Sequence, residues 1–348
     1  MRMQENYSRR PLSRLSEVAG RLLFAGLFPI ALLAGCKTSN SDNPTAQKFT
    51  IGFSAQSSDP AGDPWHLLLA NSIINAAASR GDTLYHSGAN HDQTTQLAQI
   101  RSFIAQKVQL IAFDPVTDLG WDSVLGEAKA AGIPVILVDS AILTENPDLY
   151  STTISSDYLW QGQQAGIWVR DKSGVSSSSL SIAELQGPAG WVQASDRAIG
   201  FRDIIDPSKI ALSSVGDWST NTAQATVAGW IGAGQLDGIN VIYAHNDSMA
   251  LGAVAALQAA VSAGKSGMRP GIDIKIVSID GMREAVQAIL SGTINCTIET
   301  NPMMGTLLLD AAASIIAGDS VGKWVTRSNQ VLTSDVVVNQ AYVDARPY

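Results

Sequence analysis

Polar side chains stand where several short apolar runs of the chain end. They are Asp139 after "VILV", Asn246 after "VIYAH", Asp280 after "KIVSI" and Thr300 after "CTIE". If these runs are parallel strands, their carboxyl ends meet at a sheet edge, where open α/β sheets bind ligands. Carboxylates and amides grouped there suit a neutral polyol, because each hydroxyl can donate to one group and accept from another.

Two further side chains extend this pattern. Arg197 opens a helical segment, and its guanidinium can donate several hydrogen bonds to hydroxyls or to a ring oxygen. Trp65 opens the first helical segment and offers a flat apolar face to the C–H side of a sugar. The sequence therefore predicts a carbohydrate site assembled from both halves of the chain.

The stretch "YAHNDSMALGA" allows two interpretations. A polar residue between a strand and an Ala-rich helix can cap the helix by accepting from its free N–H groups, or it can point into the ligand crevice. From the residues alone, both interpretations stay open for Asn246 and Asp247.

Motifs for catalysis or cofactor binding do not assemble in this sequence. Gly264-Lys265-Ser266 lacks the first glycine of a phosphate-binding loop, and the four histidines lack zinc-ligand spacing. An exported sugar-acting enzyme with Asp139 and Asp280 as paired carboxylates is the enzymatic alternative. We expect no catalytic residue, no metal and no cofactor.

The first 48 residues read as an export and anchoring region. Five arginines precede the apolar run "LLFAGLFPIALLAG", which ends at Cys36 in a pattern that resembles the bacterial lipobox, where the cysteine is lipidated. Residues 1–35 are the predicted signal peptide, and residues 36–48 a polar flexible tether. "SRRPLS" leaves the general and twin-arginine export routes open. We expect an exported protein, lipid-anchored at the periplasmic or extracellular face.

After the tether, β-rich runs alternate with Ala-rich segments of helical period, which predicts parallel sheets covered by helices on both faces. Strands are expected near residues 49–55, 110–115, 134–140, 180–187, 241–247, 274–280 and 294–300, and helices near 65–79, 121–131, 196–205, 223–231, 248–263 and 284–290. The fold class is α/β, with two doubly wound lobes. The formal charge of −8 argues against nucleic-acid binding, which needs clustered Lys and Arg.

Four segments make the chain similar to the type I periplasmic sugar-binding proteins of ABC importers, the ribose-binding-protein family. They are "ELQGPAGWVQASDRAIGF" (184–201), "AHNDSMALGA" (244–253), "SIDG" (278–281) and the run from Ile111 to Ser140. "YAHND", the Gly-Trp after "PVTDL" and "IETNP" resemble the galactofuranose-binding subgroup most. The resemblance implies two Rossmann-like lobes joined by a hinge of three crossings, with a sugar between them.

The resemblance also implies roles for single positions. Asp139, Arg197, Asn246 and Asp280 match family sugar contacts, and "DPWH" matches the segment with aromatic or polar contacts. With this resemblance, we interpret Asn246 as a ligand contact and Asp247 as the helix cap. The expected ligand-binding set is Asp63, Trp65, His66, Asp139, Arg197, Asn246, Asp280 and Thr300. Thr300 stands where ribose binders carry Gln. Ser140 departs from the family, which usually has Arg directly after this Asp, so the particular sugar stays open.

These observations predict a lipid-anchored substrate-binding protein, a monomer that captures a monosaccharide between its lobes and delivers it to an ABC permease and its ATPase. Residues 49–155 plus 301–332 form the expected N-terminal lobe, and residues 156–300 plus 333–348 the C-terminal lobe. The alternative is a sensor that presents a sugar or furanose signal to a receptor. A DNA-binding repressor of the same fold would need a headpiece where this chain has an export signal.

Overall fold

The computed structural model describes residues 48–57, 64–334 and 338–348. All of them belong to one compact unit, Ala46–Tyr348. The predicted signal peptide, Cys36 and most of the tether lie outside the described residues, and so does Asp63. Within the described ranges, no helix combines the length and the apolar character needed to span a membrane.

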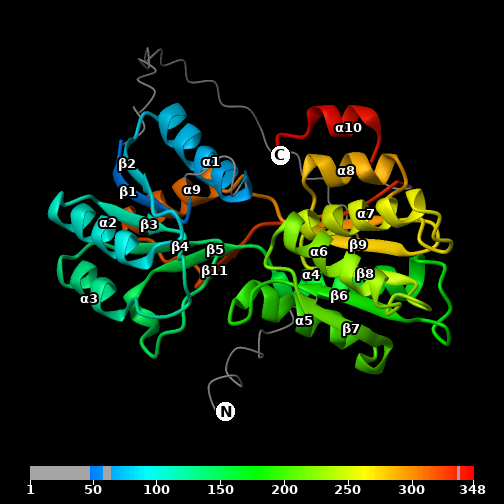
Figure 1. Ribbon diagram of the computed structural model, residues 1–348. Coiled ribbons are helices and arrows are strands. Elements are labelled where there is room, and N and C mark those ends of the chain that lie inside the picture. Colours follow the sequence, from blue (N-terminus) through cyan, green and yellow to red (C-terminus); the bar gives the residue numbers. More distant parts are fainter. Residues whose placement is uncertain (1–47, 58–63, 335–337) are drawn as a thin grey trace, which may run out of the picture. The chain divides into compact units, whose positions relative to one another are not determined.

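The first lobe is built on a parallel sheet in the order β11-β5-β4-β3-β1-β2 (Figure 1). Its strands are β1 (Thr50–Ala55), β2 (Thr83–Gly88), β3 (Leu110–Phe113), β4 (Val135–Val138), β5 (Thr152–Ser155) and β11 (Trp324–Thr326). Helices α1 (Pro64–Arg80) and α9 (Gly305–Ala317) cover one face, and α2 (Gln93–Ala105) and α3 (Asp122–Ala130) cover the other. The central strands β3 and β4 are buried throughout, because helices cover both of their faces.

The second lobe repeats this plan with the order β12-β10-β9-β8-β6-β7. Its strands are β6 (Ile182–Gln186), β7 (Ile210–Val215), β8 (Val241–Ala244), β9 (Lys275–Asp280), β10 (Cys296–Glu299) and β12 (Val331–Thr333), of which β12 alone runs antiparallel to its neighbour among the described strands. Helices α4 (Tyr158–Lys172) and α5 (Val192–Ile204) cover one face, and α6 (Thr220–Gly232), α7 (Asp247–Ser262) and α8 (Arg283–Leu290) the other. Helix α10 (Gln340–Ala345) packs against α8. The expected two-lobed α/β fold is confirmed.

The chain passes between the sheets three times: between β5 and α4, between β10 and α9, and between β11 and β12. The expected lobe boundary at 332/333 is wrong by a few residues, because Val331 and Leu332 already pair with β10 of the second sheet. We propose that the third crossing lies between Thr326 and Val331. The other lobe limits stay predictions.

Helices α4 and α5 touch backbone to backbone. A methyl group built on Gly162 of α4 would lie 2.2 Å from the carbonyl oxygen of Arg197, and one on Gly200 of α5 would lie 2.0 Å from the carbonyl oxygen of Leu159. Only glycine permits such an approach. The two glycines therefore set the position of α5, which carries Arg197, against α4.

Candidate functional site

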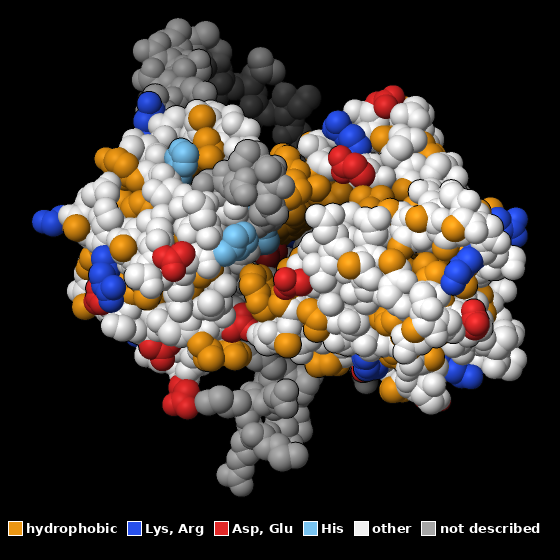
Figure 2. Space-filling model, viewed as in Figure 1, with side chains coloured by type: hydrophobic (Ala, Val, Ile, Leu, Met, Phe, Trp, Pro, Cys, Tyr) orange, Lys and Arg blue, Asp and Glu red, His pale blue; other side chains and the backbone are white. Residues whose placement is uncertain are grey.

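A cleft of about 730 Å³ lies between the two sheets, at the carboxyl ends of their strands. In the space-filling view, histidine and acidic side chains lie at this hollow between the lobes (Figure 2). Seven of the eight side chains expected to bind ligand line it: Trp65, His66, Asp139, Arg197, Asn246, Asp280 and Thr300. Asp63, the eighth, is not among the described residues. The residues expected from the sequence to bind ligand therefore line one common cavity.

Arg197 connects the polar groups of the second lobe. Its Nη1 donates to the carbonyl oxygen of His245 at 2.7 Å, and its Nε donates to Gln161 Oε1 at 3.1 Å. Its Nη2 donates to Thr300 Oγ1 at 3.0 Å and lies 3.4 Å from Asp280 Oδ1. The side chain is almost fully buried, so these bonds hold the guanidinium in one orientation.

Asp280 ends β9 in an unusual environment. Its φ of 125° lies in a region that residues other than glycine rarely adopt, and such strain collects at ligand sites. Burial raises the pKa of its carboxyl to about 7, although the neighbouring Arg197 lowers it, and the Asp247 carboxylate raises it further. Asp280 is therefore an acid whose charge changes near neutral pH.

Asp139 joins the two lobes. Its Oδ1 accepts from the Tyr158 hydroxyl at 2.6 Å, and its Oδ2 accepts from Gln193 Nε2 at 3.2 Å. Gln193 Nε2 also donates to the Ser140 hydroxyl. Tyr158 opens α4 and Gln193 lies on α5, so two side chains of the second lobe reach the end of β4 in the first. The structure therefore holds the lobes in contact through this carboxylate.

Asn246 both caps a helix and lines the cleft, whereas Asp247 does neither. Asn246 is the N-cap of α7: its side-chain oxygen accepts from the Met249 N–H at 2.9 Å, while its Nδ2 donates to the Trp218 carbonyl oxygen. It also lines the cleft. The expectation that Asp247 caps the helix is wrong, because its carboxylate points inward.

Asp247 is fully buried beneath the cleft. It accepts from the Ser278 hydroxyl, from the Thr297 hydroxyl at 2.7 Å and from the Met282 N–H at 2.6 Å. Burial raises the pKa of this carboxyl to about 6 against the effect of these hydrogen bonds. Its bonds tie α7 to the ends of β9 and β10, so Asp247 is a structural group.

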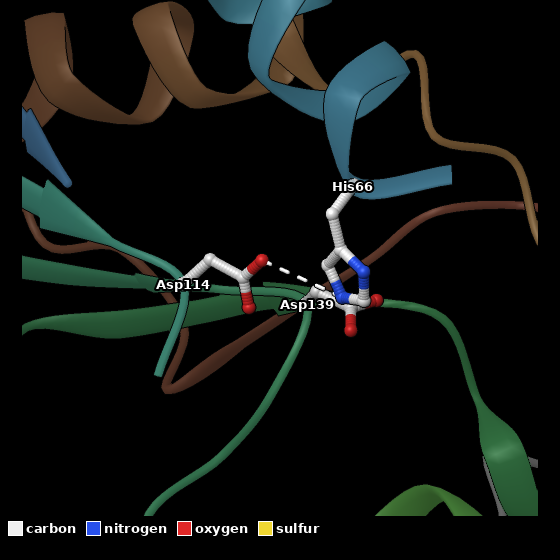
Figure 3. Close-up of side chains that lie close together, drawn as sticks. All are labelled: His66, Asp114 and Asp139. Atoms are coloured by element: carbon white, nitrogen blue, oxygen red, sulfur yellow. Dashed lines mark ion pairs between the residues drawn. The ribbon is translucent and has the colours of Figure 1, made fainter. Parts of the chain in front are cut away.

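His66, Asp114 and Asp139 form a cluster on the first-lobe wall of the cleft (Figure 3). Each contributes one potential ligand atom, and these atoms lie within 4.8 Å of one another. His66 Nε2 is 3.6 Å from Asp114 Oδ2. The three residues come from α1 and from the ends of β3 and β4, so no local spacing predicts the group. A carboxylate–imidazole pair in a cleft serves a hydroxyl ligand as well as a cation.

A second polar network supports the second-lobe side of the site. Glu184 on β6 is buried and contacts Arg202 Nη2 at 2.6 Å and His245 Nε2 at 3.1 Å. Burial alone would raise the pKa of Glu184, but hydrogen bonds from His245 and Arg202 hold it well below its ordinary range. Burial lowers the pKa of His245, so its ring is neutral. This network fixes the position of His245, whose backbone carbonyl oxygen accepts a hydrogen bond from Arg197.

Several lining residues carried no signal in the sequence. They are Gln56, His91, Tyr158, Trp191, Gln193, Asp217 and Trp218. Tyr158 and Gln193 lie on helices and are brought to the cleft by the packing of α4 on α5, which strand-end reasoning cannot locate. Trp218 was detectable only as an aromatic residue in the turn "GDWST", where both Asp217 and Trp218 adopt positive φ.

Comparison with known proteins gives the same picture. A family model described as "Periplasmic binding protein domain" matches residues 55–320. The chain is 33% identical, over 81% of its length and 86% of the relative, to the galactofuranose-binding protein YtfQ of Escherichia coli (strain K12). It is 30% identical, over 86% of its length and 90% of the relative, to the fructose import binding protein FruE of Bifidobacterium longum (strain NCC 2705).

Among solved structures, the chain resembles the periplasmic binding protein of the arabinose ABC transporter from Shewanella sp. ANA-3, bound to α- and β-L-arabinofuranose. The TM-score is 0.75 at 34% identity, over 85% of this chain and 95% of that one. This solved protein, like the two relatives above, takes its name from a sugar, and each aligns with this chain across both lobes. The chain therefore belongs to the periplasmic binding protein family, and it is close to the galactofuranose-binding group of its sugar-binding members.

Proposed function

We propose that this chain captures a neutral monosaccharide in its furanose form in the interlobe cleft and delivers it to an ABC permease driven by its ATPase. The relatives named above support the ligand class, since one is a galactofuranose-binding protein and another holds arabinofuranose. The proposal rests most on one observation within the chain, which is the presence of two carboxylates and two unsatisfied amide oxygens on residues that line the cleft.

Donors of three cleft residues are committed to the protein itself. Arg197 uses its Nε, Nη1 and Nη2 on neighbouring groups, the Trp65 indole N–H donates to the Thr300 carbonyl oxygen, and Asn246 Nδ2 donates to Trp218. The acceptors are more available: Asp139 and Asp280 present carboxylates, and the amide oxygens of Gln56 and Gln193 find no hydrogen-bond partner among the described residues.

An acceptor-rich cleft needs a ligand rich in donors and without negative charge. A sugar supplies hydroxyl donors all round its ring, whereas a sugar acid or sugar phosphate would meet the carboxylate of Asp139 and, once pH rises through 7, that of Asp280 as well. Trp65, Trp191 and Trp218 line the same cavity and can cover the C–H faces of a ring. We therefore infer that Trp65, His66, Asp139, Arg197, Asn246, Asp280 and Thr300 contact the sugar.

Capture requires the lobes to open and close. The three crossings form the hinge, and bonds such as Tyr158 to Asp139 join the lobes in the state observed. We also propose that the protein is exported and held at the membrane by a lipid on Cys36, as a monomer. A tether of about a dozen residues would let the lobes reach a permease.

Calorimetry with the purified full-length chain tests the proposal. We expect D-galactose, L-arabinose or D-fucose to bind, and galacturonate and galactose 1-phosphate not to bind. With D-galactose labelled with ¹³C at the anomeric carbon, the bound signal should have the chemical shift of a furanose. A bound pyranose signal would refute the ring form, and tighter binding of the anionic sugars would refute the ligand class.

A further inference from the structure

Gln193 reaches from α5 of the second lobe into the first lobe. Its Nε2 donates to Asp139 Oδ2 at 3.2 Å and to the Ser140 hydroxyl. The side chain lines the cleft and is only 6% exposed. It lies beside Ser140, whose short side chain leaves room for it. Gln193 is therefore a contact between the lobes as well as part of the cleft wall.

The orientation of the Gln193 amide is fixed by its partner. A carboxylate accepts hydrogen bonds and does not donate them, so the NH2 group must face Asp139. The amide oxygen is consequently directed away from Asp139. This Oε1 atom is closed off from solvent, and no described residue donates a hydrogen bond to it. A buried amide oxygen without a donor is unfavourable, and a natural cleft with such an atom points to a missing partner.

We propose that Gln193 couples the chemistry of the ligand to closure of the lobes, by accepting a hydrogen bond at Oε1 from one particular hydroxyl of the bound sugar. The inference rests on the proposed function and adds to it a specificity residue. When the lobes close on a sugar with that hydroxyl, Oε1 gains its donor. When they close on a sugar without it, Oε1 is buried unpaired, and closure is disfavoured. Gln193 also positions Asp139 through its Nε2.

These two effects of Gln193 are separable by experiment. Loss of the Nε2 bonds to Asp139 and Ser140 weakens every closed complex alike. Loss of the Oε1 bond weakens only complexes of ligands that carry the matching hydroxyl. The informative quantity is therefore the ratio of dissociation constants between each monodeoxy sugar and its parent, because a purely structural role cancels in this ratio.

The test measures this ratio by calorimetry for the wild-type chain and for Gln193→Met, which keeps the length of the side chain and removes both amide groups. The probes are D-galactose and its monodeoxy derivatives, or the same series of L-arabinose if arabinose binds more tightly. In the wild type, we expect one monodeoxy derivative to bind about tenfold or more weakly than the parent through this contact. In Gln193→Met, we expect that ratio to fall towards one while the ratios of the other derivatives stay unchanged.

Gln163→Met is the matched control. Gln163 lies on α4, and its amide donates to Asp203 on the exposed surface at 3.1 Å, outside the cleft. It should leave every ratio unchanged. Melting temperatures of the unliganded variants confirm that both are folded.

If Gln193→Met weakens the parent and all derivatives equally, Gln193 only braces Asp139, and the hydroxyl contact is refuted. Unchanged affinities refute both roles. If the wild type binds neither sugar, the proposed function fails first, and the role of Gln193 fails with it because it requires a hydroxyl ligand.

Discussion

The Arg197 guanidinium lies 3.4 Å from the Asp280 carboxylate, and both side chains are almost entirely enclosed by protein. Arg197→Met should therefore leave Asp280 and Thr300 without their charged donor and remove a sugar contact. We expect affinity for the bound sugar to fall by roughly a factor of 30 or more. Calorimetry measures this, with the exposed Arg101→Met as a control that should bind normally. Unchanged affinity would place Arg197 outside the ligand site.

Asp280 gives the stability of the unliganded protein a dependence on pH. Its pKa is about 7 in the folded chain against 3.8 for the unperturbed group, so the folded state binds the proton more tightly. The resulting stabilisation is complete below about pH 4 and is lost as pH rises through 7. The Asp280→Asn variant has no carboxyl group at this position, so it does not lose this stabilisation as pH rises.

We therefore expect Asp280→Asn to gain in free energy of unfolding relative to wild type between pH 4 and 8, by on the order of 4 kcal/mol. Urea unfolding of both proteins across this pH range measures the difference in their free energies of unfolding. Other groups that titrate, such as His245, are present in both proteins, so their contributions largely cancel in this difference. Parallel pH profiles for the two proteins would show that Asp280 is ionised throughout.

Asn246 and Asp247 should respond differently to truncation. Asn246→Ala removes the cap of α7, which costs about 1 kcal/mol of stability, and it should also weaken sugar binding. Asp247→Ala leaves the Ser278 and Thr297 hydroxyls and the Met282 N–H buried without their acceptor. We expect that variant to lose roughly 3 kcal/mol of stability. Thermal melts of unliganded protein together with calorimetry separate the two effects, and a milder loss for Asp247→Ala would contradict the observed bonding.

Ser140→Arg should change the preference among sugars rather than the fold. An arginine there would compete with Gln193 for Asp139 and add donors to a cleft that is rich in acceptors. The check is the rank order of affinities across pentoses and hexoses, beside the conservative control Ser140→Thr. If the arginine variant keeps the wild-type rank order, position 140 does not influence the ligand.

Cys36→Ala should release the protein from the membrane fraction and leave sugar affinity intact, because lipidation requires the thiol. Fractionation of cells followed by immunoblotting measures the release. Cys296→Ala serves as the control, since that cysteine is buried in β10 and should not affect membrane association. Equal membrane retention of the Cys36 variant would refute the lipid anchor.

The sequence predicted the strands that are continuous apolar runs, but not helices α2, α4 and α9. The continuous apolar runs of β3, β4 and β8 indicated buried parallel strands, and the polar residues after them indicated the sheet edge where the cleft lies. Edge strands such as β2 and β7 were not predicted, because one side of each strand faces solvent and its sequence mixes apolar and polar residues.

The sequence could not assign what depends on distant contacts. Asn246 and Asp247 are both good capping residues. Which of them caps α7 depends on the exact residue at which the helix begins, and on the Ser278 and Thr297 hydroxyls of β9 and β10, which donate to Asp247. Tyr158 and Gln193 reach the cleft because α4 packs closely on α5 and because the two lobes meet. A pattern of polar residues at strand ends carries no information about either contact.

The glycine contact between α4 and α5 links the positions of four polar side chains at or next to the cleft. Tyr158 and Gln161 lie on one helix and Gln193 and Arg197 on the other, and the first crossing leads directly into α4. Because Gly162 and Gly200 let the two helix backbones meet directly, we expect the pair to move about the hinge as one unit. We therefore expect the three that line the cleft, Tyr158, Gln193 and Arg197, to approach a ligand together. A larger residue at Gly162 or Gly200 would displace all three at once, although neither glycine lines the cleft.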